Sequence, residues 1–277
     1  MGSQSEKWDR LAYAHNRERE IASHAYLDLI ACRNTENVKL ALELKLGSPM
    51  VIEVPYILEL IGDVQGKRVL DAGCGGGFYS LLLSERGAAV LGIDSSDDMI
   101  KIAKQKALKD RLDAEFLTGN LSDLKIQDEE FDLVLSTLVL MDVKELDRTI
   151  AQLVRAVRKG GAIILSVQHP ILTAGSWERK EGEKLFRKLD HYFTERELET
   201  VWETHEKELV SFKYYHRSLQ AYVQPFLERA CVLTHLIEPR PHEVYKTLNL
   251  QEYEDAQRIP HFVILRFHKI SLSDSCG

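Results

Sequence analysis

The residues best suited to chemistry form a short glycine-rich segment that follows an acid. Residues 69–77 read Val-Leu-Asp-Ala-Gly-Cys-Gly-Gly-Gly, so four glycines follow Asp71 within six positions. Glycine accepts positive φ, and it leaves backbone N–H groups open to a ligand where a Cβ would shield them. Such a segment between a strand and a helix predicts a nucleotide-binding loop.

The spacing decides between ligand classes. A phosphate-binding loop needs GxxxxGK[ST], and no Lys-Ser or Lys-Thr follows these glycines. A dinucleotide loop needs GxGxxG, but the sixth positions counted from Gly73 and Gly75 are Phe78 and Ser80. Asp71 would repel a pyrophosphate, whereas its carboxylate suits a ligand that carries an ammonium group and a positive sulfur. The loop therefore favours S-adenosylmethionine.

A second acid, Asp94, stands about twenty residues after the loop, at the end of the next predicted strand. A carboxylate in this place can accept hydrogen bonds from both hydroxyls of a ribose. Dinucleotide enzymes share this feature. Asp94 therefore predicts a ribose without choosing the cofactor.

Short apolar runs and capping residues predict the elements that must position these residues. Strands are expected at 68–71, 89–93, 115–117, 131–136 and 162–167, with helices over 78–86, 98–109 and 146–157. One helical segment over 6–46, which Gly47-Ser48-Pro49 is expected to end, and another over 54–61 precede them. A helix at 216–229 and strands at 232–237 and 262–268 follow an irregular stretch. The alternation predicts an α/β fold with a doubly wound parallel sheet.

The same reading divides the chain into four segments. Residues 1–62 are expected to form an N-terminal helical lid, and residues 63–169 the cofactor-binding half of the core. Residues 170–213, where charged and aromatic residues mix without periodicity, read as an inserted lid or substrate segment. Residues 214–277 are expected to complete the core sheet.

Composition limits the partners. The net charge is −7 and the isoelectric point about 5.8, so neither nucleic acid nor a membrane surface is expected to bind. The four cysteines show no CxxC pair and no zinc-ligand spacing, which predicts free thiols and no metal. No apolar run approaches the roughly 18 residues of a membrane span. The chain reads as cytoplasmic.

Five segments resemble, in order and spacing, the motifs of class I S-adenosylmethionine-dependent methyltransferases, in a type 11-like small-molecule branch. They are residues 69–77, 92–99, 119–124, 131–134 and 155–161. Segments at 166–171, 190–193, 215–219 and 238–241 resemble a less characterised branch of the same enzymes. The resemblance implies a Rossmann-like sheet of seven strands, mostly parallel with an antiparallel last strand, and S-adenosyl-L-homocysteine as the product of the cofactor.

Carried over position by position, the resemblance implies a set of cofactor-binding residues. They surround the methionine part, hold the ribose, pack on the adenine or lie past strand four on the cofactor side: Asp71, Gly73, Cys74, Gly75, Gly77, Asp94, Ser95, Met99, Asn120, Leu121, Thr137 and Leu138. Many relatives carry Asp where this chain has Asn120.

Four residues are candidates for catalysis. His169 follows the fifth strand, where ligands of open α/β sheets bind, and could act as a base or fix the loop. His191 and Tyr192 in the inserted segment could line the pocket or pack against neighbouring aromatic residues. Tyr215 could likewise line the pocket or pack against neighbouring aromatic residues. Methyl transfer can rely on positioning alone, so a dedicated base is not required.

The resulting expectation is a methyltransferase, monomeric or dimeric, that acts on a small organic acceptor through an oxygen, a nitrogen or an activated carbon. Two alternatives stay open. The acceptor could be a protein or an RNA, although the acidic chain disfavours RNA. The chain could also be a regulatory module that retains the cofactor without catalysis. A dehydrogenase is a more distant reading, and the acceptor itself cannot be named from the sequence.

Overall fold

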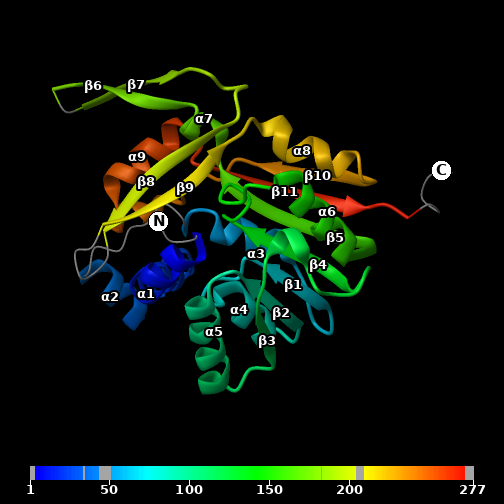
Figure 1. Ribbon diagram of the computed structural model, residues 1–277. Coiled ribbons are helices and arrows are strands. Elements are labelled where there is room, and N and C mark those ends of the chain that lie inside the picture. Colours follow the sequence, from blue (N-terminus) through cyan, green and yellow to red (C-terminus); the bar gives the residue numbers. More distant parts are fainter. Residues whose placement is uncertain (1–3, 34, 44–50, 182, 204–208, 272–277) are drawn as a thin grey trace.

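The computed structural model describes residues 4–33, 35–43, 51–181, 183–203 and 209–271, arranged around one central sheet (Figure 1). The seven strands of that sheet lie in the order β10-β11-β5-β4-β1-β2-β3. Their bounds are Arg68–Ala72 (β1), Ala89–Asp94 (β2), Ala114–Thr118 (β3), Phe131–Thr137 (β4), Val157–Gln168 (β5), Cys231–Ile237 (β10) and Phe262–Lys269 (β11).

The strand pairing confirms a mostly parallel sheet with an antiparallel last strand. β11 runs antiparallel to both of its neighbours, β5 and β10, whereas the pairs among β1 to β5 are parallel. The strand order changes direction between β1 and β4. Open α/β sheets bind ligands at such a switch point, outside the carboxyl ends of the strands.

Helices cover both faces of the sheet, as the consecutive apolar residues of β4 require. Leu133 and Leu135 pack with α3 (Val54–Ile61) and α4 (Phe78–Glu85). Val134 points to the opposite face and packs with α6 (Leu146–Ala156) and α8 (Leu219–Leu227). α5 (Asp97–Asp110) follows β2 and packs on β3. A strand with both faces buried is typical of a doubly wound sheet.

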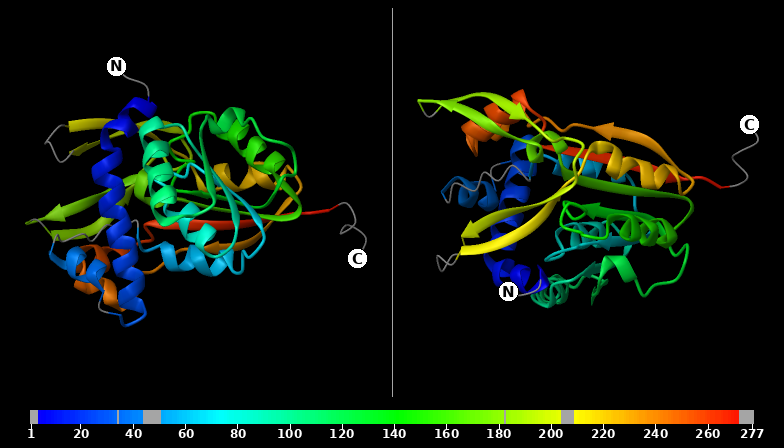
Figure 2. Two further views of the ribbon diagram at one scale, coloured as in Figure 1. Left: turned by 90° about the horizontal axis from the view of Figure 1, so that it is seen from below. Right: turned by 45° about the horizontal axis from the view of Figure 1, so that its top comes forward.

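The residues at 6–46 that were predicted as one helical segment form two helices. α1 (Gln4–Ile30) ends before Cys32, which has a left-handed φ of 54° and reverses the chain. Thr35 then accepts a hydrogen bond from the Val38 N–H at 3.4 Å as α2 (Glu36–Glu43) begins. The predicted stop at residues 47–49 lies outside the described residues. α1 contacts α5 and β9 and lies beside α5 in Figure 2.

The prediction of irregular structure over 170–213 was wrong. After α7 (Pro170–Thr173), the chain forms two hairpins, β6 (Gly175–Lys180) with β7 (Glu183–Leu189), and β8 (Arg196–Glu203) with β9 (Leu209–His216). Val210 and Phe212 of β9 are buried against Trp8 of α1. Buried and more exposed side chains therefore alternate along β9 only where the strand contacts α1. The sequence reading also missed the 3-10 helix η3 (Glu243–Thr247) and helix α9 (Leu250–Arg258).

Candidate active site

The glycine loop lies between β1 and α4, and its backbone conformation explains its composition. Gly73, Gly75 and Gly77 have positive φ of 83°, 51° and 85°. A Cβ on Gly73 would stand 2.3 Å from a methyl carbon of Val139, so the Val139 side chain would have to shift to admit it. The N–H groups of Gly73 and Cys74 both donate to the Ile93 carbonyl, at 2.7 and 3.1 Å. The loop is therefore fixed to the end of β2.

Asp94 fixes the same loop through its side chain. One carboxylate oxygen accepts a hydrogen bond from the Gly75 N–H at 2.9 Å, and the other accepts one from the Ser96 N–H at 2.9 Å. Burial raises the pKa of Asp94, although these backbone donors favour its charged form. Asp94 also lines the cavity described below, so a ligand meets a carboxylate that already has a fixed orientation.

Asp71 is buried at the end of β1 and accepts a hydrogen bond from the Ser80 hydroxyl at 2.6 Å. Burial raises the pKa of Asp71 to about 6, with the Ser80 hydrogen bond acting in the opposite direction. Burial likewise raises the pKa of the Cys74 thiol, so Cys74 is a neutral, small lining group. A cationic ligand group beside Asp71 would stabilise its carboxylate.

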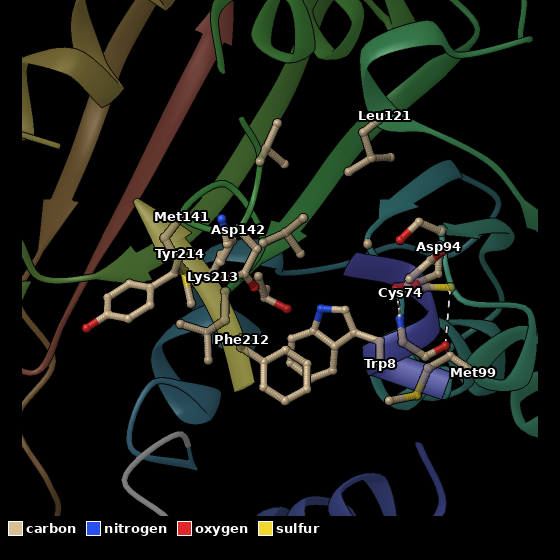
Figure 3. A pocket seen from close by; sticks show the side chains of 18 of the residues that line it. Trp8, Cys74, Asp94, Met99, Leu121, Met141, Asp142, Phe212, Lys213 and Tyr214 are labelled. Atoms are coloured by element: carbon tan, nitrogen blue, oxygen red, sulfur yellow. Dashed lines mark hydrogen bonds between the residues drawn. The ribbon is translucent and has the colours of Figure 1, made fainter. Parts of the chain in front are cut away.

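One cavity of about 1420 Å³ opens at the carboxyl ends of the parallel strands (Figure 3). All of the twelve predicted cofactor residues line it except Gly77. Gly77 instead is the N-cap residue immediately before α4, and a Cβ there would press on Ala103 and Phe116 at 3.1 and 3.2 Å. Its role is close packing between the loop and the neighbouring helix and strand. Leu138 lies past β4 as expected and turns with a left-handed φ of 56°, whereas Thr137 is the last residue of β4.

The cavity has two ends. Cys74, Asp94, Met99 and Leu121 gather at one end, whereas Met141, Asp142 and the β9 residues lie at the other (Figure 3). Trp8 of α1 lies between the two groups in this view and packs on the Phe212 ring with 4.8 Å between ring centroids. A typical site for one small ligand has a volume of roughly 300–1,000 Å³, so this cavity has room for two molecules.

Three of the four candidate catalytic residues do not line the cavity. His169 is buried, accepts a hydrogen bond from the Ile171 N–H at 3.2 Å, and lies 3.1 Å from Glu238 through its other ring nitrogen. Burial lowers the pKa of His169, against the influence of Glu238. His169 thus begins helix α7 and ties it to the segment after β10.

His191 and Tyr192 lie in the turn before β8. The His191 side chain is exposed beside Asp190, at 3.3 Å. The Tyr192 hydroxyl accepts a hydrogen bond from the Leu219 N–H at 3.2 Å, and its carbonyl contacts the His216 ring at 2.9 Å. The contacts of Tyr192 therefore hold the inserted segment to the core, whereas the His191 ring lies beside its neighbour in the chain.

Tyr215 does line the cavity. Its hydroxyl donates to Glu197 at 3.2 Å, and the Arg217 guanidinium lies 4.6 Å from its ring centroid. Burial raises its pKa. The structure therefore brings one of the four candidates to the site, with its hydroxyl already paired.

Several lining residues were missed by the sequence reading. They come from helix α1, from the segment after β4 and from β9: Trp8, Arg19, Met141, Asp142, Phe212 and Lys213. Asp142 could have been found, because it follows the fourth parallel strand, where ligands bind. No local pattern marks Trp8 or Arg19, which reach the cavity only through the packing of α1.

Asp142 is unusual among these residues because its carboxylate forms no hydrogen bond or ion pair with any other described residue. Burial raises the pKa of Asp142 to about 7, and the nearby charge of Asp94 acts in the same direction. Such a group takes up or releases a proton near neutral pH.

In the described part of the chain, no three metal-ligating side chains cluster closely enough to hold a metal ion. No described helix meets the length and hydropathy of a membrane span.

Residues 70–165 match the sequence family described as a methyltransferase domain. The malonyl-[acyl-carrier protein] O-methyltransferase of Serratia marcescens is 29% identical over 153 residues, which cover 53% of this chain and 56% of that protein. Residues 70–165 form a class I S-adenosylmethionine-dependent methyltransferase domain. With 56% of the Serratia protein covered, the chain spans about half the length of this curated relative.

Two longer matches extend beyond that domain. An uncharacterised protein of Haemophilus influenzae is 25% identical over 230 residues, which cover 79% of this chain and 88% of that protein. The crystal structure of a putative S-adenosylmethionine-dependent methyltransferase from Listeria monocytogenes superposes with a TM-score of 0.70 at 29% identity, covering 80% of this chain and 98% of that chain. These two matches therefore cover more of the chain than the methyltransferase domain alone.

The cofactor of the domain is S-adenosylmethionine, and the residues at the first end of the cavity fit it. The Gly73 position has no room for a Cβ, and the carboxylates of Asp71 and Asp94 offer acceptors for its cationic and hydroxyl groups. Met99 and Leu121 supply apolar surface there. The fit rests on the charge, size and placement of these side chains.

Proposed function

We propose that this protein is an enzyme that transfers a methyl group from S-adenosylmethionine to a small organic acceptor bound at the second end of the cavity. One observation carries this proposal. The cavity is continuous, and its cofactor end leads into a second end that is lined by aromatic and carboxylate groups. A module that only retained the cofactor would not need this second pocket.

The cofactor, when bound, supplies a methyl group on a positively charged sulfur. The protein's own residues then have two tasks. Trp8, Phe212 and the two tyrosines of β9 exclude water from the second pocket and orient a flat or apolar acceptor. Asp142 accepts the proton that an O–H or N–H acceptor loses, because its unpaired carboxylate lies in that pocket.

The size of the cavity also supports a small acceptor over a macromolecule. The site is formed by side chains of α1, β9 and the segment after β4, which surround it from separate directions. The name of the Serratia relative indicates transfer to oxygen. Oxygen is therefore the acceptor atom that we propose first, with Asp142 as its proton acceptor.

The test is to follow the methyl group. The purified protein is incubated with S-adenosylmethionine labelled in its methyl group and with a cell extract separated into small-molecule, protein and RNA fractions. Label transferred to the small-molecule fraction, and absent with an Asp94→Ala variant, is the expected result. Label in protein or RNA would contradict a small acceptor, and the absence of any transfer would favour a regulatory module.

A further inference from the structure

The guanidinium of Arg217 contacts the backbone on both sides of Asp142. Arg217 follows β9 immediately, and its two terminal nitrogens donate to the Leu140 carbonyl at 3.2 Å and to the Lys144 carbonyl at 3.0 Å. These carbonyls belong to the residues two positions before and two positions after Asp142. One planar group therefore spans the segment that carries the carboxylate of the second end of the cavity.

Arg217 is itself fixed in place. Its side chain is only 1% exposed, although it carries a charge. Buried cations are rare unless they are paired, and the Arg217 Nε donates to the carboxylate of Glu195 at 2.8 Å. With its charge balanced in this way, the guanidinium presents its remaining donors to the two carbonyls in one orientation.

Asp142 needs this support because its side chain has none of its own. Its carboxylate forms no hydrogen bond or ion pair with the described residues, so its direction depends on the backbone alone. The Asp142 N–H donates to the Val139 carbonyl at 2.8 Å, which closes a tight turn. The Tyr215 N–H donates to the Met141 carbonyl at 2.8 Å and joins this turn to β9. Arg217 adds the two side-chain hydrogen bonds to the same junction.

The effect of Arg217 on Asp142 is one of position. A cation that acted directly on the carboxylate would lower its pKa, whereas the pKa of Asp142 is raised by burial and by the charge of Asp94. The charge of Arg217 is instead matched by Glu195. Arg217 therefore acts on Asp142 through the backbone.

We propose that Arg217 is a positioning residue for methyl transfer, which holds the Asp142 carboxylate in the second end of the cavity through the Leu140 and Lys144 carbonyls. The proposal rests on the proposed function, because it takes Asp142 as the proton acceptor. It adds a residue that does not itself line the cavity. It also gives the hairpin of β8 and β9 a second task, since the end of that hairpin supplies Arg217.

A double-mutant cycle separates positioning from stability. The transfer of labelled methyl from S-adenosylmethionine into the small-molecule fraction of a cell extract is measured for the wild type, Arg217→Lys, Asp142→Asn and the double variant. The temperature is one at which circular dichroism shows all four proteins folded. Lysine keeps the positive charge beside Glu195, but it lacks the planar fork that reaches two carbonyls at once.

The matched control is Arg229→Lys. Arg229 also donates to a backbone carbonyl, that of Pro225 at 2.9 Å, and to a carboxylate, that of Asp147 at 2.8 Å. It does not line the cavity. The control therefore loses the same kinds of hydrogen bond at a place where no cavity residue depends on them.

Arg217→Lys should slow the transfer of label roughly 10- to 100-fold, as expected when a catalytic group is displaced, and should leave S-adenosylhomocysteine affinity unchanged. In the Asp142→Asn background, the same change should cost less than about three-fold, because no carboxylate is left to position. Arg229→Lys should leave the rate unchanged in both backgrounds.

A second readout does not need the acceptor. The infrared carboxyl band that Asp142→Asn removes reports the protonation of Asp142, whose pKa burial raises to about 7. In Arg217→Lys the released segment lets water reach the carboxylate, so the band should titrate nearer to the ordinary pKa of about 4. A loss of global stability alone would not move this titration in the folded protein.

Three results would overturn the proposal: a normal rate in Arg217→Lys, an equal loss of rate in both backgrounds, and an unchanged titration of the Asp142 band. If Arg217→Lys does not fold, Glu195→Ala takes its place, since Glu195 is 59% exposed and its removal frees the Arg217 guanidinium. A normal rate in Glu195→Ala would then overturn the proposal. If the wild type transfers no label, the proposed function itself fails, whereas the infrared band still decides whether Arg217 positions Asp142.

Discussion

Replacing Glu53 by glutamine should make the protein more stable above pH 7 and leave it almost unchanged at pH 5. Glu53 is fully buried, immediately before α3, and neither of its oxygens is hydrogen-bonded within the described residues. Burial raises its pKa from 4.5 to about 7, even though the charge of Arg19 acts in the opposite direction. At neutral pH the folded protein therefore carries a poorly solvated carboxylate.

The sign follows from proton binding. Between pH 4.5 and 7, the folded state retains a proton on Glu53 that the unfolded state has released. The contribution of Glu53 to stability is therefore fully present below pH 4.5 and is lost as the pH rises through about 7. Each pKa unit is worth about 1.4 kcal/mol, so the loss amounts to roughly 3 kcal/mol. Glutamine cannot lose a proton, so it avoids this loss.

The assay is urea unfolding at pH 5 and pH 8 for the wild type, Glu53→Gln and the control Glu59→Gln. Glu59 is an exposed carboxylate on α3, where the same change should be nearly neutral. Between pH 5 and pH 8, the free energy of unfolding of the wild type should fall by roughly 2–3 kcal/mol more than that of Glu53→Gln. Equal pH dependence in all three proteins would refute the reasoning.

Three further changes test the site. Asp94→Ala removes the acceptor of the Gly75 N–H and a carboxylate of the cofactor end, so calorimetry should show S-adenosylhomocysteine binding weakened roughly 100-fold; retained affinity would contradict this. Gly73→Ala places a Cβ 2.3 Å from Val139 at a φ of 83°, and thermal unfolding should reveal a loss of about 1–3 kcal/mol, whereas an unchanged melting temperature would exclude the clash. Asp142→Asn should slow transfer of labelled methyl on the order of 100-fold while leaving S-adenosylhomocysteine affinity intact, and a normal rate would remove Asp142 as proton acceptor.

The core of the fold could be predicted because its signals are local. β1, α4, β2 and α5 begin and end within about two residues of the expected positions, since glycines, caps and short apolar runs mark them. The hairpins at 175–216 could not be predicted. In β9, only Val210, Phe212 and His216 are buried, and charged residues interrupt the apolar ones in all four strands.

The sequence by itself determined the cofactor end of the site. Asp71, the glycines and Asp94 lie within one β-α-β unit, so their relative positions follow from local geometry that any such unit repeats. Only the tertiary structure decided the other end. Trp8, Asp142 and Tyr214 are far apart in the chain and meet because α1, the segment after β4 and β9 pack around one cavity. That packing also placed His169 at the start of α7, beside Glu238, and away from the cavity.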